Sequence, residues 1–333
     1  GYKALNTDNL DDPAIALPTD HFNTVLYAGD GTTNHAITGV GFQPDFVWYK
    51  VRSTTGHHNL YDSVRGVQKV VYSDLANAEA TSTGTQDLYA FGADGFTVGS
   101  NFQTLCNSSG ETFASWNWKA GGAASSNSDG TTTSSVSANT TAGFSIVSYA
   151  GSGSAGATVG HGLNQTPDLI IIKNRTAVTN WVVNSPITNS GFTEWALKLD
   201  LDQATSTDST IWNNTAPTSS VFTLGTAGES NRNNPDNYVA YCFHSVDGYS
   251  KVGKYTGNGA TDGPFVYTGF RPAFIMVKLT SAASGSWVMF DNKRDPDNPT
   301  DRVFYADINA ISTDVSSYYP YNLLSNGFKS RIP

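Results

Sequence analysis

Two glycine-rich segments come closest to a recognised nucleotide-binding motif. Gly151–Gly156 fits the G-x-G-x-x-G pattern, which holds a pyrophosphate where a strand turns into a helix. The residues after Gly156 favour a second strand instead, and the same Gly-x-Gly turn occurs at Gly29–Gly31 and Gly257–Gly259. Gly248–Tyr255 nearly matches a P-loop, but a tyrosine stands where that motif needs a magnesium-binding Ser or Thr. We therefore expect tight turns at these glycines and no bound cofactor.

Metal-binding and acid–base residues are present but do not form a known pattern. Asp295–Asp301 and Asn234–Asn237 offer oxygen atoms for calcium, yet both lack the glycine and terminal glutamate of an EF-hand loop. We interpret both segments as surface turns. The histidines show neither helical pairing nor the carboxylate spacing of a catalytic metal site. They are His21, His35, His57, His58, His161 and His244.

The sequence assigns no catalytic, cofactor-binding or metal-ligating residue, and binding residues stay unknown. There is no Gly-x-Ser-x-Gly elbow, and no matched pair of carboxylates recurs. Cys106 and Cys242 stand alone, outside any zinc spacing, and a single bridge between them is left open. The chain is therefore predicted not to be an enzyme, although acids from distant strands could still meet in a folded glycosidase or lyase.

A recurring acid–base pair and several aromatic side chains have structural interpretations. Asp62-x-x-Arg65 and Asp291-x-x-Arg294 are expected to form ion pairs that pin the turn after an aromatic strand. A binding role there is the alternative. Exposed Trp and Tyr can stack on sugars, but most aromatic residues here lie in strand patterns and are predicted to be core. These include Trp48, Tyr61, Trp181 and Trp287.

Three segments of the chain repeat one pattern: residues 22–50, 144–173 and 249–278. Each has an alternating strand ending in tyrosine, a Gly-x-Gly turn, a short strand, a proline, an apolar strand and a lysine. The tyrosine-to-proline spacings are 17, 18 and 17 residues, and proline and lysine are always six residues apart. Regular spacing of this kind indicates repeated supersecondary units. The marker residues are Tyr27, Tyr149 and Tyr255; Pro44, Pro167 and Pro272; Lys50, Lys173 and Lys278.

The alternation of apolar and polar residues predicts an all-β chain of three antiparallel, sandwich-like units. The expected order is an N-terminal extension (1–21), unit one (22–122), a Ser/Thr/Gly-rich linker (123–143), unit two (144–248) and unit three (249–333). Residues 120–142 have few large apolar side chains and are expected to be flexible or draped over the surface. Only Leu197–Thr205 suggests a short helix.

Unit three should lack a strand that the other two possess. Units one and two finish in the aromatic segments Thr112–Trp118 and Tyr238–Phe243, whereas unit three offers only Asn326–Pro333. An open sheet edge invites another strand to pair with it. We expect a neighbouring chain, the N-terminal segment or residues beyond this sequence to fill the gap.

Composition excludes two classes of partner. The net charge is −9, only 14% of residues are charged, and no Lys/Arg cluster interleaves with aromatic residues. A nucleic-acid groove needs such a cluster, so DNA and RNA are not expected to bind. No apolar run is long enough to span a membrane, and we recognise no leader.

Several short runs resemble a phage-encoded domain family found in tail-fibre and other virion proteins of marine and cyanobacterial phages. They are His57–Gly66, Asp94–Ser100, Tyr238–Phe243, Tyr255–Gly259 and Gly269–Pro272. The resemblance covers nearly the whole chain and supplies no catalytic or binding residues. It implies a structural or adhesive role on the surface of a virion.

The expected function is thus a tail-fibre or surface-decoration protein that contacts host surface glycans. Expected partners are other copies of the chain, as a homo-oligomer and in particular a trimer, other virion proteins and host surface polysaccharide. Two alternatives stay open: a polysaccharide depolymerase of a tailspike, and a purely structural capsid or tail component.

Overall fold

The computed structural model describes residues 14–185, 195–232, 236–315 and 320–331. Strands dominate this part of the chain, which confirms the all-β fold. Its helices are the 3-10 turn η2 (Pro18–Asp20) and the single turn α1 (Ser209–Trp212). The short helix expected at Leu197–Thr205 is not formed. Helix α1 begins only after Asp208, whose side chain accepts a hydrogen bond from the Thr210 amide and caps the turn.

Residues 22–118 form the first lobe, in which two antiparallel sheets face each other. The larger sheet has the order β1-β9-β3-β4-β5-β6 and the smaller sheet the order β2-β8-β7. Their bounds are β1 (Phe22–Ala28), β2 (His35–Ile37), β3 (Phe46–Val51), β4 (Asn59–Asp62), β5 (Lys69–Tyr72), β6 (Ala80–Thr81), β7 (Leu88–Gly92), β8 (Gly95–Val98) and β9 (Thr112–Trp118).

Residues 125–243 form the second lobe. Its larger sheet has the order β10-β11-β12-β19-β14-β15, and β13-β18 and β16-β17 are two-stranded. Their bounds are β10 (Ser125–Asn127), β11 (Ser134–Asn139), β12 (Phe144–Ala150), β13 (Ala157–Gly160), β14 (Leu169–Asn174), β15 (Val182–Asn184), β16 (Trp195–Ala196), β17 (Ser206–Thr207), β18 (Val221–Leu224) and β19 (Asn237–Phe243).

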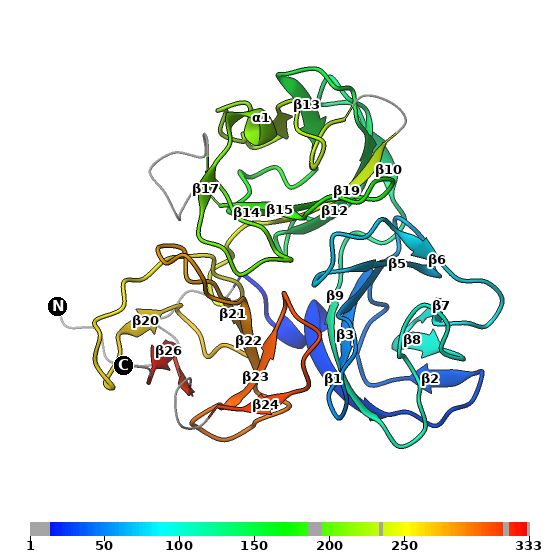
Figure 1. The fold of residues 1–333 in the computed structure, drawn as a ribbon, viewed down its shortest axis with the longest axis vertical. Coiled ribbons are helices and arrows are strands. Elements are labelled where there is room, and N and C mark those ends of the chain that lie inside the picture. Colours follow the sequence, from blue (N-terminus) through cyan, green and yellow to red (C-terminus); the bar gives the residue numbers. More distant parts are fainter. Residues whose placement is uncertain (1–13, 186–194, 233–235, 316–319, 332–333) are drawn as a thin grey trace.

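Residues 249–330 form the third lobe, with the sheets β21-β22-β23-β24 and β20-β26-β25. Their bounds are β20 (Phe265–Tyr267), β21 (Phe274–Val277), β22 (Val288–Asp291), β23 (Arg302–Tyr305), β24 (Thr313–Asp314), β25 (Tyr321–Leu324) and β26 (Gly327–Ser330). Figure 1 shows the three lobes around a common centre, with their larger sheets turned inward.

Two kinds of apolar core hold this arrangement together. One cluster at the centre draws residues from every lobe, among them Trp116, Tyr241 and Met289. Each lobe also has its own apolar cluster on the other face of its larger sheet. The central strands of the larger sheets in the first two lobes are therefore buried on both faces: all six residues of β3 and five of six in β14 are buried. Burial on both faces explains why these strands read as nearly continuous apolar runs.

Local geometry recurs at the positions that the sequence aligns. The second glycine of each Gly-x-Gly turn has a positive φ, of 74° at Gly31, 69° at Gly153 and 66° at Gly259, which glycine adopts without a steric penalty. Tyr27, Tyr149 and Tyr255 each pack edge-on against a phenylalanine of the smaller sheet, with ring centroids 6.0–6.2 Å apart. That the lobes are copies of one unit stays a prediction, which superposition of their backbones tests.

The segment expected to be a flexible linker is instead part of the second lobe. Strands β10 and β11 lie within it, and β11 pairs with β12 along its whole length, from Ser134 to Asn139. Val136 is 5% exposed and belongs to the core of this lobe. The expectation was wrong because small side chains can complete a sheet when the rest of the same lobe supplies the apolar bulk, as Val147, Tyr149 and Val159 do here. Residues 1–13 of the N-terminal extension lie outside the described residues.

Replacing Val136 with alanine should therefore lower the free energy of unfolding by about 1–3 kcal/mol, because a buried side chain is truncated. Urea denaturation measures the change. The control is S135A, which alters the exposed neighbour on the same strand and should change stability by less than about 0.5 kcal/mol. Equal stabilities of V136A and S135A would restore the linker interpretation.

Candidate functional site

The three lysines of the repeat reach from their own lobes into neighbouring ones. Lys173 Nζ donates to the Ala76 carbonyl of the first lobe at 2.8 Å. Lys278 Nζ donates to the Asp202 carbonyl of the second lobe at 2.8 Å. Lys50 Nζ lies 3.5 Å from the Asn309 carbonyl of the third lobe. Each lysine thus links its lobe to another, and the three links close a ring.

Backbone hydrogen bonds follow the same ring. The amides of Thr179, Gly285 and Gly56 donate to the three carbonyl groups that the lysines contact, at 3.0, 2.8 and 3.1 Å. Lys173 and Lys278 also donate to the carbonyl groups of Thr179 and Gly285. At each lobe boundary, a backbone amide and a lysine ammonium group of one lobe therefore contact the same carbonyl oxygen of the next lobe.

A buried aspartate in each lobe holds the start of the aromatic strand. Asp74, Asp200 and Asp307 accept hydrogen bonds at 3.0 Å from the backbone amides of the residues immediately before this strand, which are His58, Trp181 and Trp287. The Trp181 and Trp287 indoles then donate across the lobe boundary, to the carbonyls of Tyr72 at 2.7 Å and Lys198 at 2.8 Å. Sequence reasoning missed these aspartates. The available signal was the recurring Asp-Leu or Asp-Ile pair at Asp74, Asp200 and Asp307.

Burial shifts the pKa values of this network toward the neutral forms. Desolvation lowers the pKa of Lys50 and of Lys173 to about 8, against the attraction of Asp74 and Asp200 respectively. Desolvation raises the pKa of Asp200 to about 6. His58 has its pKa lowered well below the usual value, chiefly by burial and then by Lys50. Its ring accepts a hydrogen bond from the Trp48 indole at 2.9 Å, which suits a neutral imidazole.

The Asp-x-x-Arg motifs form the buried ion pairs that the sequence predicts. Asp62 accepts from the Arg65 amide at 2.8 Å and from its Nε at 2.5 Å. Asp291 and Arg294 repeat both contacts at 2.8 and 2.5 Å. The side chains of both pairs are fully buried. Each arginine also donates to a strand carbonyl, of Leu60 or Met289, so the pair pins the turn.

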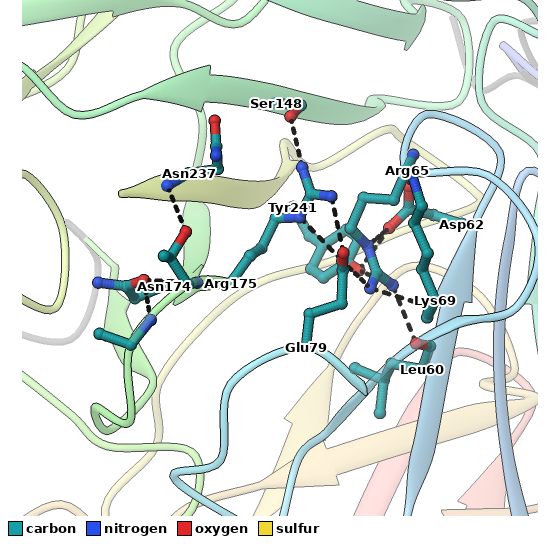
Figure 2. Close-up of polar contacts among 12 residues, drawn as sticks. Leu60, Asp62, Arg65, Lys69, Glu79, Ser148, Asn174, Arg175, Asn237 and Tyr241 are labelled. Carbon is teal, nitrogen blue, oxygen red and sulfur yellow. Dashed lines mark hydrogen bonds and ion pairs between the residues drawn. The ribbon is translucent and has the colours of Figure 1, made fainter. Parts of the chain in front are cut away.

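The first of these pairs also joins two lobes (Figure 2). Glu79 accepts from Arg65 at 3.1 Å and, through both carboxylate oxygens, from Arg175 of the second lobe at 2.8 and 2.9 Å. The Tyr241 hydroxyl, also from the second lobe, donates to Asp62 at 2.8 Å. Two-oxygen pairing of this kind fixes geometry as well as charge.

The second pair receives a matching aromatic side chain from the first lobe. Trp116 on β9 donates its indole N–H to Asp291 at 3.1 Å. The Arg294 guanidinium lies over the Trp116 ring, 5.6 Å from its centroid. Trp116 on β9 and Tyr241 on β19 therefore play the same part, because each is inserted against the Asp–Arg pair of another lobe.

The other residues considered for chemistry are dispersed. His57 lies 2.6 Å from Asp74, His35 lies 2.7 Å from Asn107, and His161 lies 3.2 Å from the Thr218 carbonyl. Cys106 and Cys242 are free and buried. Among the described residues, no group of three or more His, Cys, Asp or Glu side chains is placed to hold a metal ion. The structure describes no helix that could cross a membrane.

The aromatic residues predicted to be core are buried: Trp48, Tyr61, Trp181 and Trp287 are at most 5% exposed.

A groove lies beside the third lobe. Its volume is about 1760 Å³, and β21 forms one wall. Phe22 and Trp118 of the first lobe line it, as do Leu169 and Phe243 of the second. These residues are only partly buried at the margin of the central core. The groove therefore exposes apolar surface at the meeting point of three lobes, where a partner could bind.

Breaking the first Asp–Arg pair should destabilise the fold strongly. The R65M variant leaves the buried Asp62 carboxylate without its cation, so we expect a loss of about 3–5 kcal/mol in the free energy of unfolding. Chemical denaturation measures it, with R271M at an exposed arginine as the control. A loss below about 1 kcal/mol in R65M would contradict a structural role for the pair.

Lys173 should give stability a measurable pH dependence. Its pKa in the folded chain is about 8, whereas an unfolded lysine titrates near ~10.4. The unfolded chain binds more protons between these values, so the free energy of unfolding should rise with pH across this window, by about 1.4 kcal/mol per unit of pKa shift. Unfolding of the natural chain and of K173M between pH 7 and pH 10 tests this. Parallel profiles for the two proteins would contradict the burial of an ammonium group here.

Comparison with known proteins identifies a family. A search of curated proteins and a search of solved structures each found no match. A family model described as a domain of unknown function, DUF7483, matches residues 17–333. This match spans all three lobes and nearly the whole chain. The protein therefore belongs to the DUF7483 family.

Proposed function

We propose that this chain is a structural and adhesive component of a bacteriophage virion, placed in a tail fibre or on the particle surface. The observation that carries the proposal is that fully or partly buried charged side chains lie at the lobe boundaries. Lys173, Lys278, Glu79 and the Asp62–Arg65 pair hold lobe to lobe. Ionisable groups of this kind, placed at lobe boundaries, suit a scaffold. The resemblance of the sequence to phage virion proteins supplies the setting.

The adhesive part of the proposal rests on two exposed aromatic side chains. Phe265 is 46% exposed and Tyr267 is 66% exposed, while Val266 between them packs inward. All three lie on β20, which pairs with β26 and forms an edge of the smaller sheet. Neighbouring exposed rings on one strand face can stack on the apolar faces of sugars. Host surface polysaccharide is the ligand that this proposal assigns.

The remaining partners belong to the same proposal. The chain assembles with other copies of itself, in particular as a trimer, and with other virion proteins. It acts without catalysis, at the surface of the particle. Immunogold labelling of intact particles with antibodies against the chain measures its position, and absence of the label from purified virions would contradict the proposal.

The double variant F265A/Y267A should bind host surface polysaccharide at least about tenfold more weakly than the natural chain, because each ring contributes on the order of 1 kcal/mol. Surface plasmon resonance on immobilised polysaccharide measures this. The control is F102A, which removes a ring that is 59% exposed on the first lobe and should leave binding unchanged. Equal loss in both variants would mean that these two rings are not the contact. Release of oligosaccharides in the same incubation would contradict a non-catalytic role and favour a depolymerase.

A further inference from the structure

In the first two lobes, one strand closes the larger sheet by pairing on both of its edges. Strand β9 lies between β1 and β3, with Trp118 opposite Phe22 on one side and opposite Phe46 on the other. Strand β19 lies between β12 and β14, with Phe243 opposite Phe144 and Leu169. We call β9 and β19 the closing strands. Both run antiparallel to their two neighbours.

In the third lobe, the corresponding position holds no strand of the described chain. Strand β21 begins two residues after Pro272, as β3 begins two residues after Pro44 and β14 two residues after Pro167. Its one partner strand among the described residues is β22. Residues 251–258, which align with β1 and β12, form no strand. The groove runs between these residues and β21, since Lys254, Tyr255, Phe274 and Met276 all line it.

Strand β21 is less buried than the corresponding strands β3 and β14 of the other lobes. All six residues of β3 are buried, and five of six in β14, but in β21 only Ile275 is buried. Ile275 faces the core of its own lobe. Phe274 and Met276 face the central core and stay half-buried. Among the described residues, no strand covers the apolar surface that a closing strand covers in the other lobes.

Each closing strand also inserts an aromatic residue into another lobe. Tyr241 on β19 stacks on Phe46 with ring centroids 4.4 Å apart and donates to Asp62. Trp116 on β9 lies 5.9 Å from Phe274 and donates to Asp291.

A third insertion would complete the ring at Leu169 and Ser185 of the second lobe. Leu169 opens β14 as Phe46 opens β3, and the register of β14 with β15 places Ser185 beside Leu169, as Asp62 lies opposite Phe46. Both residues line the groove. The second lobe therefore carries a receiving site at the position where the other two lobes accept an aromatic side chain.

We propose that this groove binds an extended strand from a separate polypeptide, antiparallel to β21 and between β21 and residues 251–258. The strand completes the larger sheet of the third lobe by β-augmentation. It carries apolar side chains at alternate positions against the central core, and an aromatic residue at the position equivalent to Tyr241 lies beside Leu169 and Ser185. Main-chain hydrogen bonds supply affinity, and this aromatic residue supplies specificity.

Charge on the groove identifies the donor further. The chain has a net charge of −9, yet the charged residues that line the groove are all basic: Lys251, Lys254, Arg271, Lys278 and Lys293. Lys251, Lys254 and Arg271 are exposed. Acidic residues beside the apolar strand would be attracted to this rim. The donor is therefore an acidic, aromatic segment that is unpaired before it binds.

A second copy of the chain fits the groove less well. Its segments with the required pattern, β9 and β19, already pair on both edges within their own sheets. Insertion of an edge strand would bring its whole sheet against the first-lobe side chains Phe22 and Trp118 that line the groove. A single unpaired segment avoids both conflicts.

The test uses the full chain and a fluorescent synthetic peptide with the sequence of Asp236–Phe243, carrying C242A to prevent oxidation. This peptide has the closing-strand pattern and an acidic residue at its start. Fluorescence anisotropy should show saturable binding of one peptide per chain. The A240P version lacks a central amide and should bind at least about tenfold more weakly. A photoreactive phenylalanine in place of Tyr241 should cross-link to β14 or to residues 182–185.

Protein variants test the charged rim. K251E and K254E should each weaken binding by about threefold or more and reduce its dependence on salt. The control K69E changes a lysine that does not line the groove and should leave binding unchanged.

Five results would overturn the proposal. Four of them are absence of saturable binding, equal binding of the A240P peptide, cross-links confined to other surfaces, and binding that appears only after residues 1–13 are deleted. The fifth is a stable dimer in light scattering. If chemical labelling reaches the groove residues only after dilution separates the dimer, the groove binds a second copy and the proposal is wrong.

Discussion

The closing strand is the element on which the rest of this structure depends. Strands β9 and β19 each pair on both edges and so join the two halves of their sheet. Their side chains pack alternately into the core of their own lobe and into the central core. Phe113 packs within the first lobe, while Trp116 crosses to the third. A sheet buried on both faces must satisfy its backbone internally. The two-sided pairing does this and allows three sandwiches to share one apolar centre.

Buried charges fix which lobes meet and in what orientation. Apolar packing alone tolerates sliding, whereas the Lys173 ammonium and the Arg65–Glu79–Arg175 network have specific partners across lobe boundaries. Desolvating these groups is unfavourable and their hydrogen bonds offset part of that penalty. The network is therefore better understood as a source of specificity than of net stability. A scaffold that presents surfaces to partners has this need, which agrees with the proposed role in a virion.

Sequence patterns predicted local features well and contacts between lobes poorly. Alternating apolar residues predicted the all-β fold, and the Asp62-x-x-Arg65 spacing predicted its ion pair, because both depend on residues near one another in the chain. Asp200 was missed because the sequence around a single aspartate does not indicate whether its side chain is buried. The pairing of β11 with β12 was missed because small and polar residues dominate β11, with Ser at three of its six positions. Trp116 and Asp291 are 175 residues apart, and nothing local indicates such a contact.

Among the described residues, no strand of the third lobe takes the place that β9 and β19 have in the first two lobes. Hydrogen exchange of the free, full-length chain, resolved by residue, tests it most directly. Amides of β3 and β14 should all exchange slowly, because each strand is paired on both edges. Alternate amides of β21, those directed to the groove, should exchange roughly 100-fold faster or more. Uniform protection of β21 in a monomer, equal to that of β3 and β14, would contradict the account.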